Sequence, residues 1–431
     1  MTDRSWGFRT RALHAGGSPD PTTGARAVPI FQTTSFVFED AADAGALFAL
    51  QKYGNIYSRI GNPTVAAFEE RIASLEGGLG AVATGSGQAA EFCVFAALAG
   101  AGDHIVSSSS LYGGTVTQLS GTLRRLGVET TFVSGGDPAH YAAAIRDNTK
   151  LIFAEVVSNP SNDVADIRGL AEVAHAHGIP LVVDATTVTP YLCRPIEHGA
   201  DIVIHSATKF LGGHGTTLGG VIVDAGTFDW GSGRFPHFTE PVPSYGDIRW
   251  WDNFGEYAFL TKVRVEELRD IGPALSPFNA FLLLQGVETL PQRMREHVAN
   301  ARRVAEWLEA DPRVTWVSYA GLPGHPSHER ARVYTPEGPG AVFSFGIDGG
   351  AAAAETFIAH VQLLSHLANI GDARSLVIHP ASTTHRQLTP AQLAEAGVPD
   401  DLIRLSVGLE DVDDILWDID QALTAATGST R

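Results

Sequence analysis

The stretch that decides the fold covers residues 201–215 and reads Asp201-Ile-Val-Ile-His-Ser206-Ala-Thr208-Lys209-Phe-Leu-Gly-Gly-His-Gly215. Its first part is short and almost wholly apolar, as is Pro180-Leu-Val-Val-Asp184 before it. Such strands are buried on both faces, which is typical of a parallel sheet covered by helices on both sides. Both stretches end in polar residues, so we predict an α/β domain whose ligands bind where the strands end.

Similar apolar strands lie before and after this pair, and helical patterns separate several of them. Thr64–Glu76 places its apolar residues on one helical face and ends at Gly77, and Ala165–His177 ends at Gly178. This alternation predicts a mainly parallel sheet. The expected strands are 79–84, 104–107, 129–133, 151–156, 180–184, 201–205 and 220–223.

The pattern divides the chain into three parts. Residues 1–60 are rich in Gly, Pro and Thr and are predicted to form an irregular arm, whereas 61–270 form the large α/β domain and 271–431 a smaller α+β domain. The segment 226–258 carries aromatic residues and prolines without periodicity, so we expect a long ordered loop with a functional role. Helices are expected at 261–270, after 276 and at 292–310, with strands near 314–318, 341–345 and 402–407.

The composition excludes several classes of protein. A formal net charge of −18 over 431 residues argues against nucleic acid or an anionic membrane as a partner. The two cysteines are too few for a disulfide framework and fit a reducing compartment. The first residues lack the apolar core of a signal peptide, and the most apolar stretch, 92–102, is too short to span a membrane. We therefore expect a cytoplasmic protein.

Lysine is rare, since only four of the 30 basic residues are lysines. Arginine cannot supply a nucleophilic amine near neutral pH, so these four are the candidates for amine chemistry. Lys52, Lys150 and Lys262 lie in polar segments and are predicted to be solvated. Lys209 directly follows a buried strand, where desolvation lowers the pKa of an amine and makes it a nucleophile.

Three strand ends supply the remaining parts of a candidate site. Ser86, Gly87 and Gln88 stand between a strand and a helix, where free backbone N–H groups can bind a phosphate. Asp184 ends a buried strand, where a carboxylate needs a cation or a metal, and a helix-capping role is the alternative. Together with Lys209 and the hydroxyl groups of Ser206 and Thr208, these residues meet the needs of pyridoxal phosphate (PLP), with Asp184 holding the protonated ring nitrogen. The Gly-Ser-Gly turn also fits a dinucleotide site, although the next strand ends in serines rather than in an acidic residue.

Several longer motifs resemble those of one known family. They are Ser206–Gly215, Tyr57-Ser-Arg-Ile-Gly-Asn-Pro-Thr64, Arg404-Leu-Ser-Val-Gly-Leu-Glu-Asp411, Val28-Pro-Ile-Phe-Gln-Thr-Thr-Ser35 and His379-Pro-Ala-Ser-Thr-Thr-His385. Their order along nearly the whole chain resembles that of the Cys/Met-metabolism family of PLP-dependent enzymes. The resemblance implies the PLP-dependent transferase fold, aspartate-aminotransferase-like (fold type I), with an N-terminal arm that contacts a neighbouring subunit.

The resemblance also implies roles around the cofactor. Tyr112 would stack on the cofactor ring and assist Lys209 in proton transfer, and Asn159 would donate to the ring oxygen. Tyr57 and Arg59 would reach the phosphate of a neighbouring subunit's cofactor, which implies a homo-oligomer, expected to be a tetramer built from dimers. A loop tyrosine, a turn asparagine and a surface arginine are the alternatives at Tyr112, Asn159 and Arg59.

Substrate binding is implied for Arg404, Asn369 and Tyr57. Arg404 lies within an apolar strand, where its guanidinium needs a partner. A substrate α-carboxylate would satisfy it through two hydrogen bonds, and a structural salt bridge is the competing interpretation.

The expected reaction is a γ-replacement in which O-acetylhomoserine and sulfide give homocysteine and acetate, with O-acetylserine as a possible second substrate. Segment 226–258 and Asn369-Ile-Gly-Asp favour the sulfhydrylase subgroup over the γ-lyases and cystathionine γ-synthases, which stay open as alternatives. A nicotinamide-dependent oxidoreductase is the alternative from another class. Val156, Ala185 and Gly246 depart from the family's usual residues, and the histidines show no zinc-binding spacing.

Overall fold

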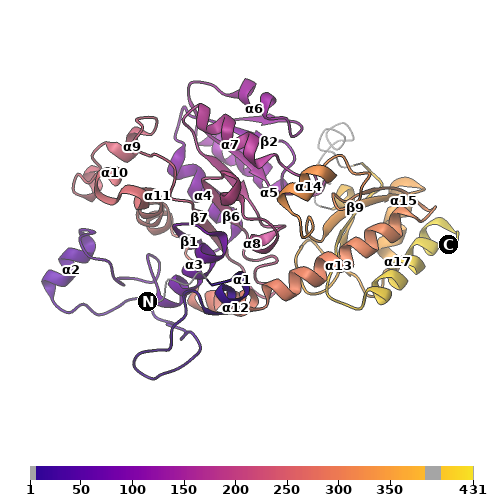
Figure 1. Ribbon diagram of the computed structural model, residues 1–431, viewed down its shortest axis with the longest axis horizontal. Helices are drawn as coiled ribbons and strands as arrows, with labels where there is room; N and C mark the ends of the chain where they lie inside the picture. The colour runs from indigo at the N-terminus through magenta and orange to yellow at the C-terminus, as the bar shows by residue number, and fades with distance from the viewer. Residues whose placement is uncertain (1–5, 384–398, 431) are drawn as a thin grey trace.

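The computed structural model describes residues 6–383 and 399–430. These residues are arranged around two β-sheets (Figure 1). The larger sheet contains, within this part of the chain, β1 (Gly80–Thr84), β2 (His104–Ser108), β3 (Glu129–Val133), β4 (Thr149–Glu155), β5 (Leu181–Asp184), β6 (Ile202–His205) and β7 (Gly220–Asp224). Their order is β1-β7-β6-β5-β4-β2-β3. β7 runs antiparallel to both neighbours and the other pairs are parallel, so the mainly parallel sheet is confirmed.

Both faces of this sheet are buried, as its apolar strands require. Along β4, Leu151 and Phe153 belong to the core under α4 (Gly87–Leu98) and the π-helix η5 (Val263–Ile271). Ile152 and Ala154 belong to the opposite core, under α3 (Pro63–Glu76) and α7 (Ile167–Ala176). Alternate side chains of one strand therefore enter different cores.

Helix α3 shows how local sequence sets the ends of an element. Pro63 occupies its first turn, and the Asn62 side chain accepts the N–H of Thr64 over 3.0 Å. Gly77 adopts φ +81°, a left-handed conformation that glycine takes easily, and ends the helix as the sequence predicted.

The segment 226–258 is ordered, as we expected, but it is not a loop throughout. It contains α9 (Pro236–Thr239) and α10 (Trp250–Phe254), with one short 3-10 turn between them (Pro243–Tyr245) and another after α10 (Gly255–Tyr257). Trp230, Phe238 and Trp250 are fully buried and pack into the core under α4. Burial of the aromatic rings thus orders a segment whose sequence has no periodicity. The helix expected at 261–270 is present as α11 (Ala258–Lys262) continued by η5.

The C-terminal part begins with α12 (Pro277–Glu288) and the long α13 (Leu290–Glu309), which runs from the large domain toward the second sheet (Figure 1). In the described residues that sheet has the order β10-β11-β12-β9-β8 and is antiparallel apart from the pair β10/β11. Its strands are β8 (Val314–Ser318), β9 (Val342–Ile347), β10 (Ser365–His366), β11 (Leu376–Ile378) and β12 (Leu402–Ser406), and α15 (Gly350–His360) and α17 (Val412–Thr427) pack together beside it.

Within residues 6–60, the described part of the arm, there are two short helices where we expected irregular structure. α1 (Phe8–His14) packs on α3 and α12 of the same chain, whereas α2 (Ala41–Phe48) lies far out on the arm (Figure 1). Contact of this arm with a neighbouring subunit stays a prediction. None of the helices in the described ranges has both the length and the apolar character needed to cross a membrane.

Candidate active site

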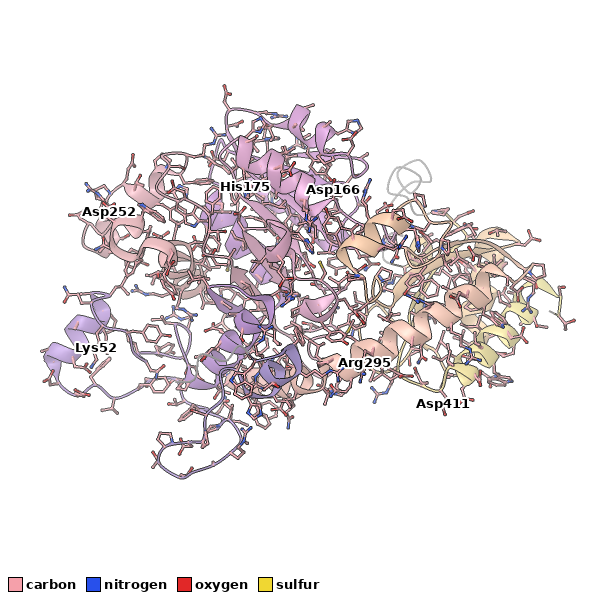
Figure 2. The ribbon with its side chains drawn as sticks, in the orientation of Figure 1. Lys52, Asp166, His175, Asp252, Arg295 and Asp411 are labelled. Atoms are coloured by element: carbon pink, nitrogen blue, oxygen red, sulfur yellow. The ribbon has the colours of Figure 1, made fainter. Side chains whose placement is uncertain are left out.

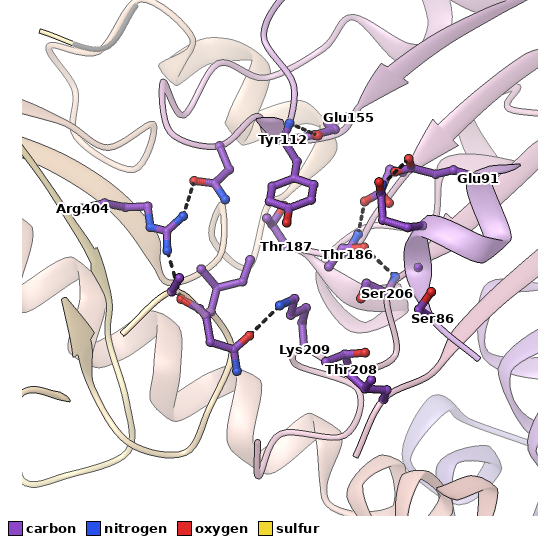
Figure 3. A pocket seen from close by; sticks show the side chains of 18 residues that line it. Ser86, Glu91, Tyr112, Glu155, Thr186, Thr187, Ser206, Thr208, Lys209 and Arg404 are labelled. Atoms are coloured by element: carbon purple, nitrogen blue, oxygen red, sulfur yellow. Dashed lines mark hydrogen bonds between the residues drawn. The ribbon is translucent and has the colours of Figure 1, made fainter. Parts of the chain in front are cut away.

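A cavity of about 250 Å³ lies at the carboxyl ends of β4, β5 and β6 and is closed by residues of the C-terminal part (Figure 3). All the residues predicted for the site line it, except Tyr57 and Arg59. The lining residues are Ser86, Gly87, Gln88, Glu91, Tyr112, Glu155, Asn159, Asp184, Thr186, Thr187, Ser206, Thr208, Lys209, Leu218, Ala368, Asn369, Ile370 and Arg404. The fold thus brings together side chains as distant along the chain as Ser86 and Arg404, in the place where α/β sheets bind ligands.

The start of α4 forms a cradle of the kind that binds phosphate. Ser86 caps the helix by accepting the N–H of Ala89 over 3.1 Å. A Cβ on Gly87 would lie 2.6 Å from the Cβ of Ser206, so only glycine fits between the helix and the end of β6. Thr208 borders the cavity, but its hydroxyl is bonded to the backbone of Gly219 rather than left free for a ligand.

Lys209 is partly buried and enters the cavity from the turn after β6. Burial, helped by the positive charge of Arg404, lowers the pKa of its amine to about 8. Nζ donates a hydrogen bond to Oδ1 of Asn369 over 2.5 Å. Arg293 holds the same turn in place, since its guanidinium donates to the carbonyl oxygens of Phe210 and Leu211 over 2.8 and 3.1 Å. The amine is therefore held in place and easily deprotonated near neutral pH.

The other three lysines are engaged elsewhere. Lys52 lies on the exposed arm, as predicted, and pairs with Asp43 (Figure 2). The prediction that Lys262 is solvated is wrong, because it is only 5% exposed and binds Glu266 and Glu267. Lys150 is also partly buried. Packing between helices buries the aliphatic stem of Lys262, and the two carboxylates compensate its charge. A sequence pattern does not report such packing.

Three carboxyl groups meet on one side of the cavity. Glu155 ends β4 and lies in direct register with Asp184, which ends β5, and Glu91 covers both from α4. Burial raises the pKa of all three groups, that of Glu91 to about 8, and the charge of Asp184 adds to the shift at Glu91 and Glu155. These three carboxyl groups favour a cationic group on the ligand, such as a protonated ring nitrogen.

Arg404 enters the cavity from β12 without a carboxylate partner among the described residues. It donates instead to the carbonyl oxygen of Asn369 over 3.0 Å and, weakly, to Oδ1 of Asn159 over 3.4 Å. Burial lowers the pKa of its guanidinium to about 10. The structure therefore favours the carboxylate-binding interpretation of Arg404 over a salt bridge within the described ranges.

Tyr57 and Arg59 do not reach the cavity of their own chain. The Arg59 guanidinium lies 5.4 Å from the ring centre of Tyr57 and donates to the carbonyl oxygen of Arg269. Their proposed action on a neighbouring subunit's cofactor stays a prediction.

Sequence reasoning missed Glu91, Glu155, Thr186 and Thr187 among the lining residues. Glu91 stands one helical turn after Gln88, whose amide donates to it over 2.7 Å. That spacing places the two on one face of α4 and could have indicated Glu91. In the described residues no cluster of three or more His, Cys, Asp or Glu side chains is arranged to hold a metal ion.

The sequence model of one family, described as "Cys/Met metabolism PLP-dependent enzyme", matches residues 9–424. The chain belongs to this family. Similar proteins include the O-acetyl-L-homoserine sulfhydrylase of Leptospira meyeri, 51% identical over 97% of both chains. The homocysteine synthase of Schizosaccharomyces pombe is 53% identical over 97% of this chain and 98% of its own.

The solved structure of a relative has the same fold. It is that of a putative O-acetylhomoserine (thiol)-lyase from Campylobacter jejuni with N'-pyridoxyl-lysine-5'-monophosphate, which is 38% identical to this chain with a TM-score of 0.94 and covers 97% of this chain and 100% of its own. The PLP-dependent transferase fold and the cofactor expected from the sequence are therefore confirmed.

The residues of the cavity fit PLP. The narrow cradle at Gly87, the amine of Lys209 and the buried carboxyl of Asp184 supply a phosphate site, a nucleophile and a partner for a ring cation. The Gly-Ser-Gly turn therefore belongs to a PLP-dependent enzyme and not to the nicotinamide-dependent oxidoreductase that we kept as an alternative.

Proposed function

We propose that this enzyme catalyses a γ-replacement in which O-acetylhomoserine and sulfide give homocysteine and acetate. One observation carries the proposal: Asn369 contacts Lys209 through its side chain and Arg404 through its carbonyl oxygen. The cavity thus offers an amine and a carboxylate-binding guanidinium side by side, which suits an α-amino acid. The curated relatives named as sulfhydrylases and homocysteine synthases support the substrate class.

PLP, when bound, supplies an aldehyde for the substrate amine and a ring that withdraws electrons from Cα. Ser86, Gly87 and Ser206 would hold its phosphate, and Asp184 its ring nitrogen. Arg404 binds the substrate α-carboxylate and orients the Cα–H bond. The Lys209 amine removes the proton from Cα and exchanges protons at Cβ, for which a pKa of about 8 is well suited.

Tyr112 lies at the mouth of the cavity, where its ring is 53% exposed. From there its hydroxyl can assist Lys209 in moving protons while the ring covers the cofactor. Acetate leaves from Cγ with its bonding electrons, and hydrosulfide adds at the same carbon. Tyr57 and Arg59 act on the cofactor phosphate of a neighbouring subunit, so we propose a homo-oligomer with shared sites.

Product analysis tests the reaction. The purified holoenzyme, given O-acetyl-L-homoserine and sulfide, should release acetate and homocysteine in equal amounts, measured by mass spectrometry. Formation of 2-oxobutanoate and ammonia without a thiol product would instead identify a γ-lyase. A panel of O-acetylserine, O-succinylhomoserine, methanethiol and cysteine then defines the donor and the acceptor.

A further inference from the structure

Glu155 is a carboxyl group that the proposed chemistry does not use, although it lines the cavity. It ends β4 in direct register with Asp184, and its side chain is only 9% exposed. Two carboxyl groups side by side on adjacent strands repel each other when both are ionised. A buried carboxyl in this position is unfavourable unless hydrogen bonds satisfy it.

The hydrogen bonds of Glu155 go to the backbone of two residues at the cofactor site. Its Oε1 accepts the N–H of Tyr112 over 2.6 Å (Figure 3). The backbone N–H of Asn159 also faces this carboxyl group and acts to lower its pKa. Tyr112 belongs to the loop after β2 and Asn159 to the loop after β4. One side chain therefore joins the loops that follow two paired strands, β2 and β4.

We propose that Glu155 is a positioning residue of the cofactor site: its carboxyl group holds the backbone of Tyr112 and of Asn159 and thereby sets where their side chains meet the cavity. The inference rests on the cofactor site, which family membership establishes, and deepens the proposed function by naming what places its Tyr112.

The groups around Glu155 agree with a hydrogen-bonding role rather than a charge-pairing role. From β5 it faces Asp184 and from α4 it faces Glu91, both of which are acidic. No lysine or arginine pairs with Glu155 within the described ranges. Burial and the Asp184 charge raise its pKa well above the ordinary value, which favours the neutral acid. A glutamine closely resembles that form, because it keeps an oxygen acceptor at the same reach.

Two substitutions separate hydrogen bonding from charge. Glu155→Gln keeps the reach and the acceptor but cannot ionise, whereas Glu155→Asp keeps an ionisable carboxyl group but shortens the side chain by one methylene. Glu155→Ala removes both. Glu91→Gln is the matched control, since it removes a buried carboxyl from the same cavity without touching Tyr112 or Asn159.

The first readout is the PLP dissociation constant, measured by titration of the cofactor-free full chain. The second is hydrogen exchange of the peptides that contain Tyr112 and Asn159, measured by mass spectrometry on the cofactor-free and the PLP-bound protein. We expect Glu155→Gln to bind PLP within roughly threefold of wild type, and Glu155→Asp and Glu155→Ala to bind about tenfold or more weakly, with faster exchange in both peptides. Glu91→Gln should leave the exchange of the Asn159 peptide unchanged.

The proposal is overturned if Glu155→Asp behaves as wild type while Glu155→Gln weakens binding, or if Glu155→Ala leaves exchange at Tyr112 and Asn159 unchanged. If Glu155→Ala fails to fold, the relative PLP affinities of Glu155→Gln and Glu155→Asp still test the proposal. Neither readout depends on which reaction the enzyme catalyses, so a wrong substrate assignment would leave the result intact.

Discussion

The amine of Lys209 donates a hydrogen bond to the side chain of Asn369 over 2.5 Å, although 160 positions separate the two residues. Lys209 belongs to the large α/β domain, and Asn369 precedes β11 of the second sheet. The same asparagine accepts a hydrogen bond from Arg404 through its carbonyl oxygen. This residue therefore couples the amine to the guanidinium, and the second sheet completes the site.

Changing Asn369 should alter the titration of Lys209. Asn369→Asp places a carboxylate beside the amine, which stabilises the ammonium form and raises its pKa from about 8, by roughly one unit. PLP uptake by the cofactor-free protein should then need a higher pH. Asn369→Ala, which adds no charge, is the control. An identical pH profile of the uptake rate in wild type and Asn369→Asp would contradict the contact.

The cofactor should be attached to one lysine. Borohydride treatment of the holoenzyme fixes PLP on the amine that holds it, and peptide mapping should find it on Lys209 alone. Lys52, Lys150 and Lys262 should remain unlabelled, because each is paired with at least one carboxylate. Label on any of these three would refute the assignment. Lys209→Ala should abolish turnover.

Arg404 should control the affinity for the amino-acid substrate. Loss of a bidentate, charge-assisted pair costs about 3 kcal/mol, so Arg404→Met should raise KM for the acyl-homoserine roughly 100-fold. Arg404→Lys should recover only part of this, because an ammonium cannot bind a carboxylate through a planar fork. The PLP dissociation constant should change little in either variant. A KM within a few-fold of wild type would favour a structural role.

Gly87 should be intolerant of a side chain. A Cβ at this position would lie 2.6 Å from Cβ and 2.9 Å from Cα of Ser206, so Gly87→Ala must push the α4 N-terminus away from the end of β6. We expect PLP to bind about tenfold or more weakly. Gly121→Ala is the matched control, since its Cβ would meet nothing within 4 Å. Equal PLP affinity in both variants would rule out the narrow cradle.

Glu91 should make the stability of the cofactor-free protein depend on pH. The pKa of this carboxyl is about 8 in the folded chain against an ordinary 4.5, so the folded state binds the extra proton between these values. Its contribution to stability is complete below pH 4.5 and is lost as the pH rises through about 8. Glu91→Gln should therefore melt near wild type at about pH 5 and above it at about pH 9. A melting difference that is the same at both pH values would contradict burial of an ionisable Glu91.

Much of the fold was predictable because the signals are local. The apolar runs ending at Asp184 and His205 are too short and too uniform for anything but buried strands, and both strands lie within one residue of their expected bounds. Gly77 ends α3 where the pattern placed it. The short helices of segment 226–258 were not predicted, because its order comes from burial of Trp230 and Trp250 against distant residues rather than from any local period.

The strands, the choice of Lys209 among four lysines and the predicted phosphate-binding turn at Gly87 could all be inferred from the sequence, because each is a property of a few consecutive residues. The three-dimensional fold was needed to show that Asn369 joins Lys209 to Arg404, that Lys262 is buried, and that Glu91 and Glu155 stand beside Asp184. Burial and proximity depend on what packs against a residue. Strands that end at the same edge of a sheet bring side chains together without any trace in their spacing along the chain.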